Sequence, residues 1–299
     1  ILWRPSADDI DSSRLAQYRK WLLQHHKIGF SGYELLWQWS VDHPELFWET
    51  IVSFFKVKFH TPYSSVLSGG PMPDMVWFEG ATVNYAEHIY YGMQHQSVAM
   101  LFATELDTLR TVGVDEMWRE VSRIRAYFRK HGIKQGDRIA AYLPNIPEAT
   151  FAFLAAASLG AVWSCCSQDF GVSSVVDRFA QIEPKLFIAA DGYLYNGKKH
   201  QRTEEINAII AALPCLKDTL VIPYIGTALD FDDTGITKYT SLADGESGPP
   251  SFVAVPFNHP LWILYSSGTT GAPKAITHSH GGCLLEHLKY LAFHNDVHE

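Results

Sequence analysis

The chain has few cysteines, no excess of positive charge and no long hydrophobic run. It contains only 4 cysteines in 299 residues, two of them adjacent at Cys165 and Cys166, so we expect no disulfide framework and favour the reducing cytosol. Its 24 Lys and Arg against 32 Asp and Glu give a net charge of −8, which excludes a basic field for nucleic acid or an anionic membrane. Any nucleotide must therefore be held by a local site.

The longest apolar stretch, residues 149–163, is shorter than the roughly 20 residues that span a bilayer, and it contains Ser158 and Gly160. We expect it to be a buried helix that leads into a strand. No secretory signal is evident, and the chain begins at Ile1 rather than at Met, so we expect the natural amino terminus to lie upstream. Apolar residues are abundant. They make up 47% of the chain, with 9 Trp and 17 Phe, and this content indicates a substantial core.

Helical patterns fill the first part of the chain. Residues 31–34, Ser-Gly-Tyr-Glu, fit a capping box for one helix, and Pro44 falls in the first turn of the next. The Gly- and Pro-rich segment 68–73 then indicates a boundary. We therefore expect a helical amino-terminal cap over residues 1–75 and a second domain over 76–299.

Helix and strand patterns alternate beyond this boundary. Strands are expected at 139–143, 161–165, 186–190 and 219–222. Helices are expected at 117–128, 147–159, 173–182, 203–213 and 282–293. This succession predicts an α/β fold in which helices pack on both faces of a parallel sheet. Residues 226–259 are acidic and rich in Gly, Pro and Ser, which is typical of an exposed connection.

A string of hydroxyl residues, glycines and one lysine follows the apolar run 261–264. It reads Ser-Ser-Gly-Thr-Thr-Gly-Ala-Pro-Lys over residues 266–274. Glycines let backbone N–H groups approach an anion, hydroxyls donate hydrogen bonds, and lysine adds a positive charge. Because Pro273 precedes the lysine and the β-branched Ile276 follows, we expect a hairpin loop and not the strand–loop–helix of a Walker motif. Ser/Thr/Gly runs are often plain turns, so the ordered string carries the interpretation and its composition does not.

The string resembles the phosphate loop, here residues 265–274, of the adenylate-forming enzymes, which are the acyl-CoA synthetases and their relatives. It departs from most of them in having Ala275 where glycine is usual and Ser266 where threonine is commoner. Segment 136–163 looks like the corresponding βαβ unit of the acyl-CoA synthetases, and segment 77–87 resembles the entry motif of the branch that activates short acids. Four further segments are most similar to the subfamily that activates acetoacetate, with the acetate-activating subfamily as the alternative: 163–171, 177–179, 195–198 and 273–276.

The resemblance implies that ATP, with Mg²⁺, activates acetoacetate as an acyl-adenylate and that coenzyme A then takes the acyl group. It assigns the ATP phosphates to Ser266, Ser267, Gly268, Thr269, Thr270, Gly271 and Lys274. It gives Lys274 the further role of stabilising the departing pyrophosphate. It assigns coenzyme A to Phe170, Gly171, Asn196, Gly197 and Lys198. Lys198 and Lys199 also fit an ordinary solvated pair on a turn.

No metal site is expected at His278, His280 and His287, which lack cysteine or carboxylate partners at ligand spacing. Only 25 residues follow Lys274 (299 − 274). The resemblance places the adenine pocket, the acyl pocket and the main catalytic lysine further along than that. We therefore expect an amino-terminal fragment of a ligase that is inactive alone. Two alternatives stay open: a truncated protein that acts only by binding, and an adenylation module that loads a carrier protein.

Overall fold

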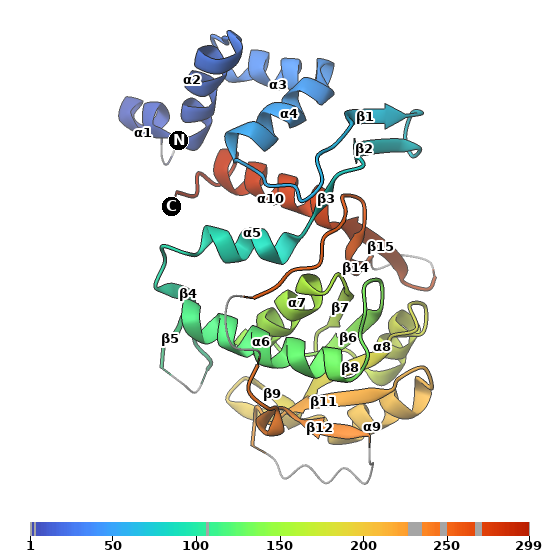
Figure 1. Ribbon diagram of the computed structural model, residues 1–299. Coiled ribbons are helices and arrows are strands. Elements are labelled where there is room, and N and C mark those ends of the chain that lie inside the picture. Colours follow the sequence, from blue (N-terminus) through green and yellow to red (C-terminus); the bar gives the residue numbers. More distant parts are fainter. Residues whose placement is uncertain are drawn as a thin grey trace. The chain divides into compact units, whose positions relative to one another are not determined.

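The computed structural model describes residues 2, 4–105, 108–226, 235–245, 250–266 and 271–298 (Figure 1). The chain forms two compact units. Unit 1 comprises Ile1–Val83, Pro256–Asn258 and His280–Glu299, and unit 2 comprises Asn84–Val255 and His259–Ser279. Unit 1 therefore combines residues from both ends of the sequence.

Unit 1 is built mainly from helices. They are α1 (Ala7–Ser12), α2 (Arg14–His26), α3 (Tyr33–Asp42), α4 (Pro44–Phe54) and α10 (His280–Phe293). Tyr18 of α2 is fully buried, and its hydroxyl lies 2.7 Å from Thr50 Oγ1. Its ring packs against Phe54 and Phe293. These aromatic side chains form a core, as expected, and the predicted start of α4 at Pro44 is confirmed.

The capping box predicted at Ser31 does not form. The N-cap of α3 is Gly32, whose extended backbone (φ −159°, ψ 173°) directly precedes the helix. Glycine has no side chain with which to accept a hydrogen bond from the first turn, so this helix starts without a side-chain cap.

Residues 65–79 form a hairpin and not a continuation of the helical segment. Strand β1 (Ser65–Gly69) pairs antiparallel with β2 (Met75–Glu79). Gly69 has φ +85° and Pro71 and Pro73 follow it, and this combination excludes a continuous helix. The segment taken as a boundary is thus the turn of this hairpin. A two-residue strand, β3 (Thr82–Val83), comes next.

Unit 2 contains a seven-stranded sheet in the order β12-β11-β8-β6-β7-β14-β15. Its strands are β6 (Arg138–Tyr142), β7 (Val162–Cys166), β8 (Leu186–Ala190), β11 (Asp218–Ile222), β12 (Ile236–Lys238), β14 (Pro260–Ser266) and β15 (Lys274–Ser279). Neighbouring strands are parallel, except that β15 runs antiparallel to β14. The predicted parallel sheet is confirmed, and four of its strands lie within one residue of their expected positions.

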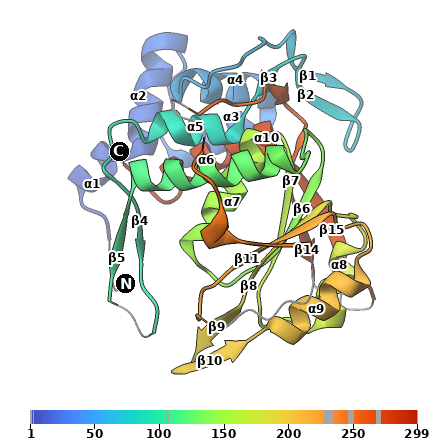
Figure 2. The ribbon, with the colours of Figure 1, turned by 60° about the horizontal axis from the view of Figure 1, so that its bottom comes forward.

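Helices cover both faces of this sheet (Figure 2). One face carries α6 (Val114–Lys130) and α7 (Pro147–Ser158), and the other carries α8 (Val172–Phe179) and α9 (Thr203–Ala212). In β6, Ala140 and Tyr142 belong to the core formed with α8 and α9. Ala141, which lies between them, faces the opposite side of the sheet. Burial on both sides explains why the strand sequences are continuously apolar.

The remaining elements of unit 2 are short. They are α5 (Tyr85–Gly92), the hairpins β4 (Val98–Phe102)–β5 (Arg110–Gly113) and β9 (Gly192–Tyr195)–β10 (Lys198–Gln201), the 3₁₀ turn Tyr239–Ser241, and β13 (Val255–Pro256), which runs into unit 1. The expected connection 226–259 is not wholly irregular, because β12 adds an edge strand parallel to β11. Three residues carry too short a pattern for β12 to be recognised from sequence.

Two further observations concern membrane spans and cysteines. Over the described part of the chain, no helix combines the length and the apolar character needed to cross a membrane. All four cysteines are free thiols, and Cys166 and Cys283 are buried.

Candidate functional site

The sheet of unit 2 has a topological switch point at the carboxyl ends of β6 and β7. The connections that leave these neighbouring strands lead to helices on opposite faces, α7 and α8 (Figure 2). Ligands of open α/β sheets bind at such a switch point. Strand β14 lies parallel beside β7, with Trp262 opposite Trp163, so its carboxyl end opens at the same edge. The described start of the predicted phosphate loop therefore lies at the edge where open α/β sheets bind ligands.

The predicted hairpin is confirmed at both described ends of the loop. Ser266, the last residue of β14, is registered opposite Lys274, the first residue of β15. Side chains at directly opposite positions of an antiparallel pair are close neighbours. A hydroxyl and an ammonium group thus begin the two arms of the loop, and Gly271 and Lys274 are exposed. The predicted contacts Ser267, Gly268, Thr269 and Thr270 lie outside the described residues.

Two side-chain hydrogen bonds hold the base of the hairpin in the sheet. The Ser164 hydroxyl of β7 donates to the carbonyl oxygen of Ile263 at 2.8 Å. The Trp262 indole N–H donates to Nδ1 of His278 across β14 and β15 at 3.0 Å. Since His278 uses a ring nitrogen in this way, it supports the hairpin. Among the described residues there is no group of three His, Cys, Asp or Glu side chains that could hold a metal ion.

Helix α8 contacts one arm of the loop, and the turn that follows the helix contacts the other. The Tyr265 hydroxyl donates to the carbonyl oxygen of Arg178 at 2.7 Å, and Gln181 Nε2 donates to the carbonyl oxygen of Pro273 at 3.0 Å. Burial is the main cause that raises the pKa of Tyr265, to about 12. The hydroxyl therefore stays protonated, and able to donate, at any ordinary assay pH.

The first predicted coenzyme A segment, Phe170-Gly171, belongs to the connection between β7 and α8. The buried Tyr142 hydroxyl lies 2.7 Å from the Phe170 carbonyl oxygen and 3.0 Å from that of Gln168. Burial raises the pKa of Tyr142 to about 12. Gln168 Nε2 in turn donates to the Ala190 carbonyl oxygen of β8 at 2.6 Å. The backbone of this connection is thus tied to two strands.

The second predicted coenzyme A segment is the turn between β9 and β10. Asn196 (φ 51°) and Gly197 (φ 70°) are both left-handed, as in a two-residue hairpin. The carboxylate of Glu105 accepts hydrogen bonds from both of their N–H groups, at 3.0 and 2.6 Å. These backbone hydrogen bonds lower the pKa of Glu105, so the carboxylate stays charged. An anion already occupies the backbone donors that a phosphate would use.

Arg202 links residues that neighbour the two predicted coenzyme A segments in sequence, rather than the segments themselves. Its Nε donates to the Gln168 carbonyl oxygen at 3.0 Å, and Nη2 donates to the Tyr193 hydroxyl at 3.2 Å. Both lysines are exposed, but the Lys199 ammonium group already donates to the Ile225 carbonyl oxygen at 2.8 Å. Lys198 is therefore better placed than Lys199 to meet a bound anion.

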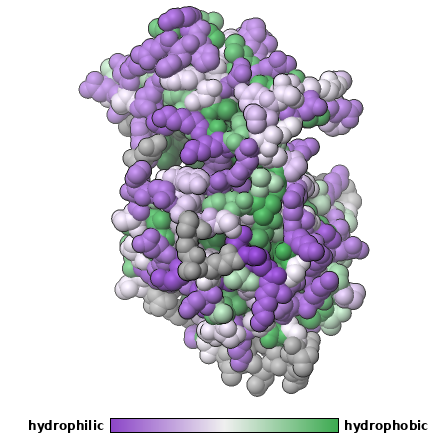
Figure 3. All heavy atoms as spheres, in the orientation of Figure 1, coloured by the Kyte–Doolittle hydropathy of each residue, from purple (hydrophilic) through white to green (hydrophobic). Residues whose placement is uncertain are grey.

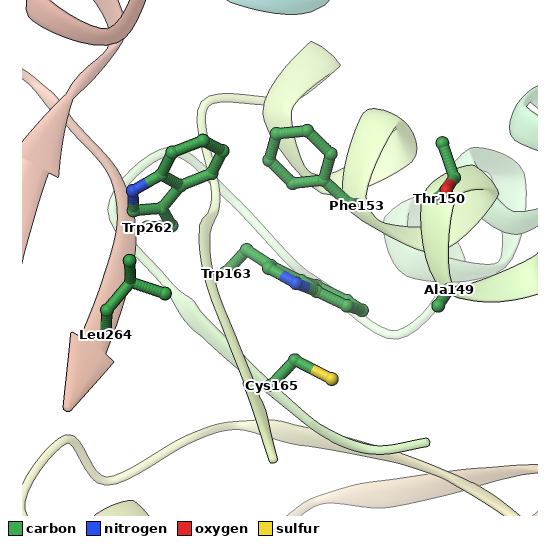
Figure 4. Close-up of a pocket in the computed structure, with 7 residues that line it drawn as sticks. All are labelled: Ala149, Thr150, Phe153, Trp163, Cys165, Trp262 and Leu264. Atoms are coloured by element: carbon green, nitrogen blue, oxygen red, sulfur yellow. The ribbon is translucent and has the colours of Figure 1, made fainter. Parts of the chain in front are cut away.

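An apolar pocket of about 340 Å³ lies on the face of the sheet next to the loop-bearing strand. It is lined by Ala149, Thr150 and Phe153 of α7, Trp163 and Cys165 of β7, and Trp262 and Leu264 of β14 (Figure 4). Hydrophobic atoms gather over α7, β7 and β14 in the space-filling view (Figure 3). This apolar lining is unsuited to phosphate. We therefore do not assign the ATP phosphates to this pocket.

Sequence reasoning missed the residues that support the loop. Arg178 lies in a segment singled out only for its resemblance, and Tyr265 lies at the start of the loop without an assigned role. Gln181 carried no signal, because a glutamine after a helix is common on any surface. Only the pairing of distant segments shows what these three side chains do.

Two family models match this chain. One, described as AMP-binding enzyme, covers residues 92–297, and the other, described as acetyl-coenzyme A synthetase N-terminus, covers residues 33–89. Together they include the hairpin and the segments discussed above.

Similar proteins have names that agree with these models. The acetoacetyl-CoA synthetase of Xenopus tropicalis is 38% identical over 99% of this chain, and the acetoacetyl-coenzyme A synthetase of Rhizobium meliloti is 38% identical over 98%. The solved structure of acetoacetyl-CoA synthetase from Streptomyces lividans superposes with a TM-score of 0.93 at 43% identity over 99% of this chain. The chain spans 45–46% of the length of these relatives.

Proposed function

The chain belongs to the AMP-binding enzyme family, and from this premise we propose that the complete protein is an AMP-forming acid–thiol ligase that converts acetoacetate into acetoacetyl-CoA. The observation that carries the proposal is the hairpin that sets Ser266 opposite Lys274 at the carboxyl edge of a parallel sheet. The names of the similar proteins support acetoacetate as the acid.

The proposed reaction has two steps. An oxygen of the carboxylate attacks the α-phosphorus of ATP, a new P–O bond forms, the α–β bridge breaks, and pyrophosphate leaves. The sulfur of coenzyme A then attacks the acyl carbon, its thiol proton is released, and AMP leaves with the electrons of the broken C–O bond. The first step gathers negative charge on phosphate oxygens, so catalysis there depends on positioning and electrostatic stabilisation.

Each loop residue has a role in this proposal. The hydroxyls of Ser266, Ser267, Thr269 and Thr270 donate to the β- and γ-phosphates, Gly268 and Gly271 let the backbone approach, and Lys274 holds the departing pyrophosphate. The register supports the roles of Ser266 and Lys274. It places a hydroxyl group on one arm of the loop directly opposite an ammonium group on the other.

Mg²⁺ enters the proposal as the counter-ion of ATP, whose phosphate oxygens it neutralises. Coenzyme A is proposed to contact Phe170, Gly171, Asn196, Gly197 and Lys198. The free cysteines support the cytosol, and a role in lipid metabolism and ketone-body use follows from the acid itself.

The proposed division of the chain places a helical cap at residues 1–75 and the first part of the AMP-binding domain at 76–299. The compact units divide first between Val83 and Asn84, and α10 joins unit 1. One observation favours a second acid: the model that matches residues 33–89 is described by acetyl-coenzyme A synthetase. Acetate or another short acid is therefore the alternative substrate.

The complete protein tests the proposal directly. With MgATP and acetoacetate, we expect exchange of labelled pyrophosphate into ATP, and a thioester once coenzyme A is added. A preference for acetate at equal concentration would favour the alternative acid. Absence of exchange with every short acid would reject the ligase assignment.

Lys274→Ala is the matching substitution. Because the ammonium group acts on charge that develops in the first step, adenylation should slow by roughly 10²–10³-fold, the range seen when one such donor is removed. Thioester formation from supplied acyl-adenylate should change far less. Lys130→Ala, at an exposed lysine on α6, is the control. Equal losses in both half-reactions would contradict the role of Lys274.

A further inference from the structure

The end of α8 and the turn after it make hydrogen bonds to the two arms of the phosphate loop. Tyr265 stands immediately before the loop's described start, Ser266, and its hydroxyl donates to the carbonyl oxygen of Arg178. Pro273 stands immediately before Lys274, and its carbonyl oxygen accepts from Gln181 Nε2. Residues at the end of α8 and in the turn after it therefore contact the chain just before Ser266 and just before Lys274.

Gln181 uses both amide hydrogens in this arrangement. Its Nε2 donates to the Asp177 carbonyl oxygen of α8 at 2.7 Å and to the Pro273 carbonyl oxygen at 3.0 Å. The side chain thus bridges the last turn of a helix and the residue that precedes Lys274. Proline fixes its own φ, so restraint of its carbonyl also restrains the direction in which Lys274 leaves.

The guanidinium group of Arg178 contacts α8 itself and the rings of Phe170 and Tyr265. Its Nη1 donates to the carbonyl and hydroxyl oxygens of Ser174, both at 2.6 Å. Its centre lies 4.9 Å from the centroid of the Phe170 ring and 5.9 Å from that of Tyr265. These distances are those of cation–π contacts. Arg178 therefore keeps Tyr265 in place through a ring contact as well as through its carbonyl group.

We propose that Gln181 and Arg178 are positioning residues for the phosphate loop, which hold Lys274 at the distance from Ser266 that pyrophosphate departure requires. This inference rests on the proposed ligase function and goes beyond it, because neither residue belongs to the loop. The core of the unit does not explain Gln181, since its side chain is exposed on the surface. The contact with Pro273 gives it a role in aligning the loop.

The test uses the complete protein with Gln181→Met, which keeps the side-chain length and removes both donors. We expect kcat/KM for ATP in pyrophosphate exchange to fall roughly three- to tenfold, the equivalent of one net hydrogen bond. Thioester formation from supplied acyl-adenylate should stay unchanged. Gln94→Met, at an exposed glutamine beyond α5, is the matched control and should change neither half-reaction.

A second measurement separates positioning from general support. If Gln181 acts through Lys274, Gln181→Met should cost less than about twofold further in a Lys274→Ala background, because the two changes are then coupled. Additive losses, equal losses in both half-reactions, or an unchanged kcat/KM would overturn the inference. Should Gln181→Met fail to fold, Tyr265→Phe decides by the same criteria. An inactive unmodified protein would instead reject the ligase function itself.

Discussion

At the scale of single residues, Asn84 shows why the segment 77–87 has an asparagine at this position. Asn84 is fully buried, and its side-chain oxygen accepts from the N–H groups of Ala86 and Glu87 at the start of α5. Its Nδ2 donates to the carbonyl oxygens of Ala157 and Val253, both at 2.9 Å. An amide is the side chain that can accept and donate in this way at once.

Asn84→Asp should therefore destabilise the protein strongly despite its similar shape. The carboxylate loses both donors and faces two carbonyl oxygens without water, at a cost of about 3 kcal/mol at pH 7.5. Burial beside carbonyl groups raises the pKa of the introduced acid, so the folded state holds the proton more tightly than the unfolded state. The penalty should consequently shrink as the pH falls toward 5.

Urea unfolding of the complete protein at pH 7.5 and pH 5 measures both effects. Asn295→Asp, at an exposed asparagine after α10, serves as the control and should shift the midpoint little. An Asn84→Asp protein as stable as the unmodified one would show that water or a shifted backbone replaces the lost donors.

At the scale of elements, the turn of the β9–β10 hairpin is a predicted ligand segment, and its N–H groups bind the carboxylate of a residue outside the hairpin. The Glu105 carboxylate accepts from the two N–H groups of the turn at Asn196 and Gly197. A phosphate of coenzyme A that contacted Lys198 would come close to this negative charge. The carboxylate and such a phosphate would therefore compete for the same backbone donors.

Glu105→Gln should tighten the binding of coenzyme A if this turn is part of its site. Removal of the charge leaves an acceptor for one N–H group and relieves repulsion, which we expect to lower the dissociation constant by roughly two- to fivefold at low salt. Titration calorimetry of the complete protein at two salt concentrations measures the change. Glu204→Gln, on α9, controls for net charge. Unchanged affinity would remove Asn196 and Gly197 from the proposed site.

At the scale of the whole molecule, the chain covers 45–46% of the length of its similar proteins. The resemblance puts the adenine pocket, the acyl pocket and the main catalytic lysine beyond residue 299. We expect the 299-residue chain by itself to give no pyrophosphate exchange above background, while the complete protein does. Exchange by the purified 299-residue chain, with the Lys274→Ala form as its blank, would contradict this.

Much of the scaffold could be predicted because its signals are local. Strand β8 and the start of α7 at Pro147 lie where the apolar pattern and the proline placed them. The hairpin at residues 65–79 was missed because it follows a strongly helical part of the chain, and the interruption was interpreted as a boundary. The short edge strand β12 was missed because it owes its existence to pairing with β11.

By itself, the sequence determined the alternation of helices and strands, the hairpin that ends at Lys274 and the family, because periodicity and an ordered motif depend on neighbouring residues. Only the tertiary structure decided what supports that hairpin. Gln181 meets Pro273 across 92 residues, and Glu105 meets Asn196 across 91. Contacts between such distant residues arise only when the sheet has closed, and the type of side chain at either end does not reveal its partner.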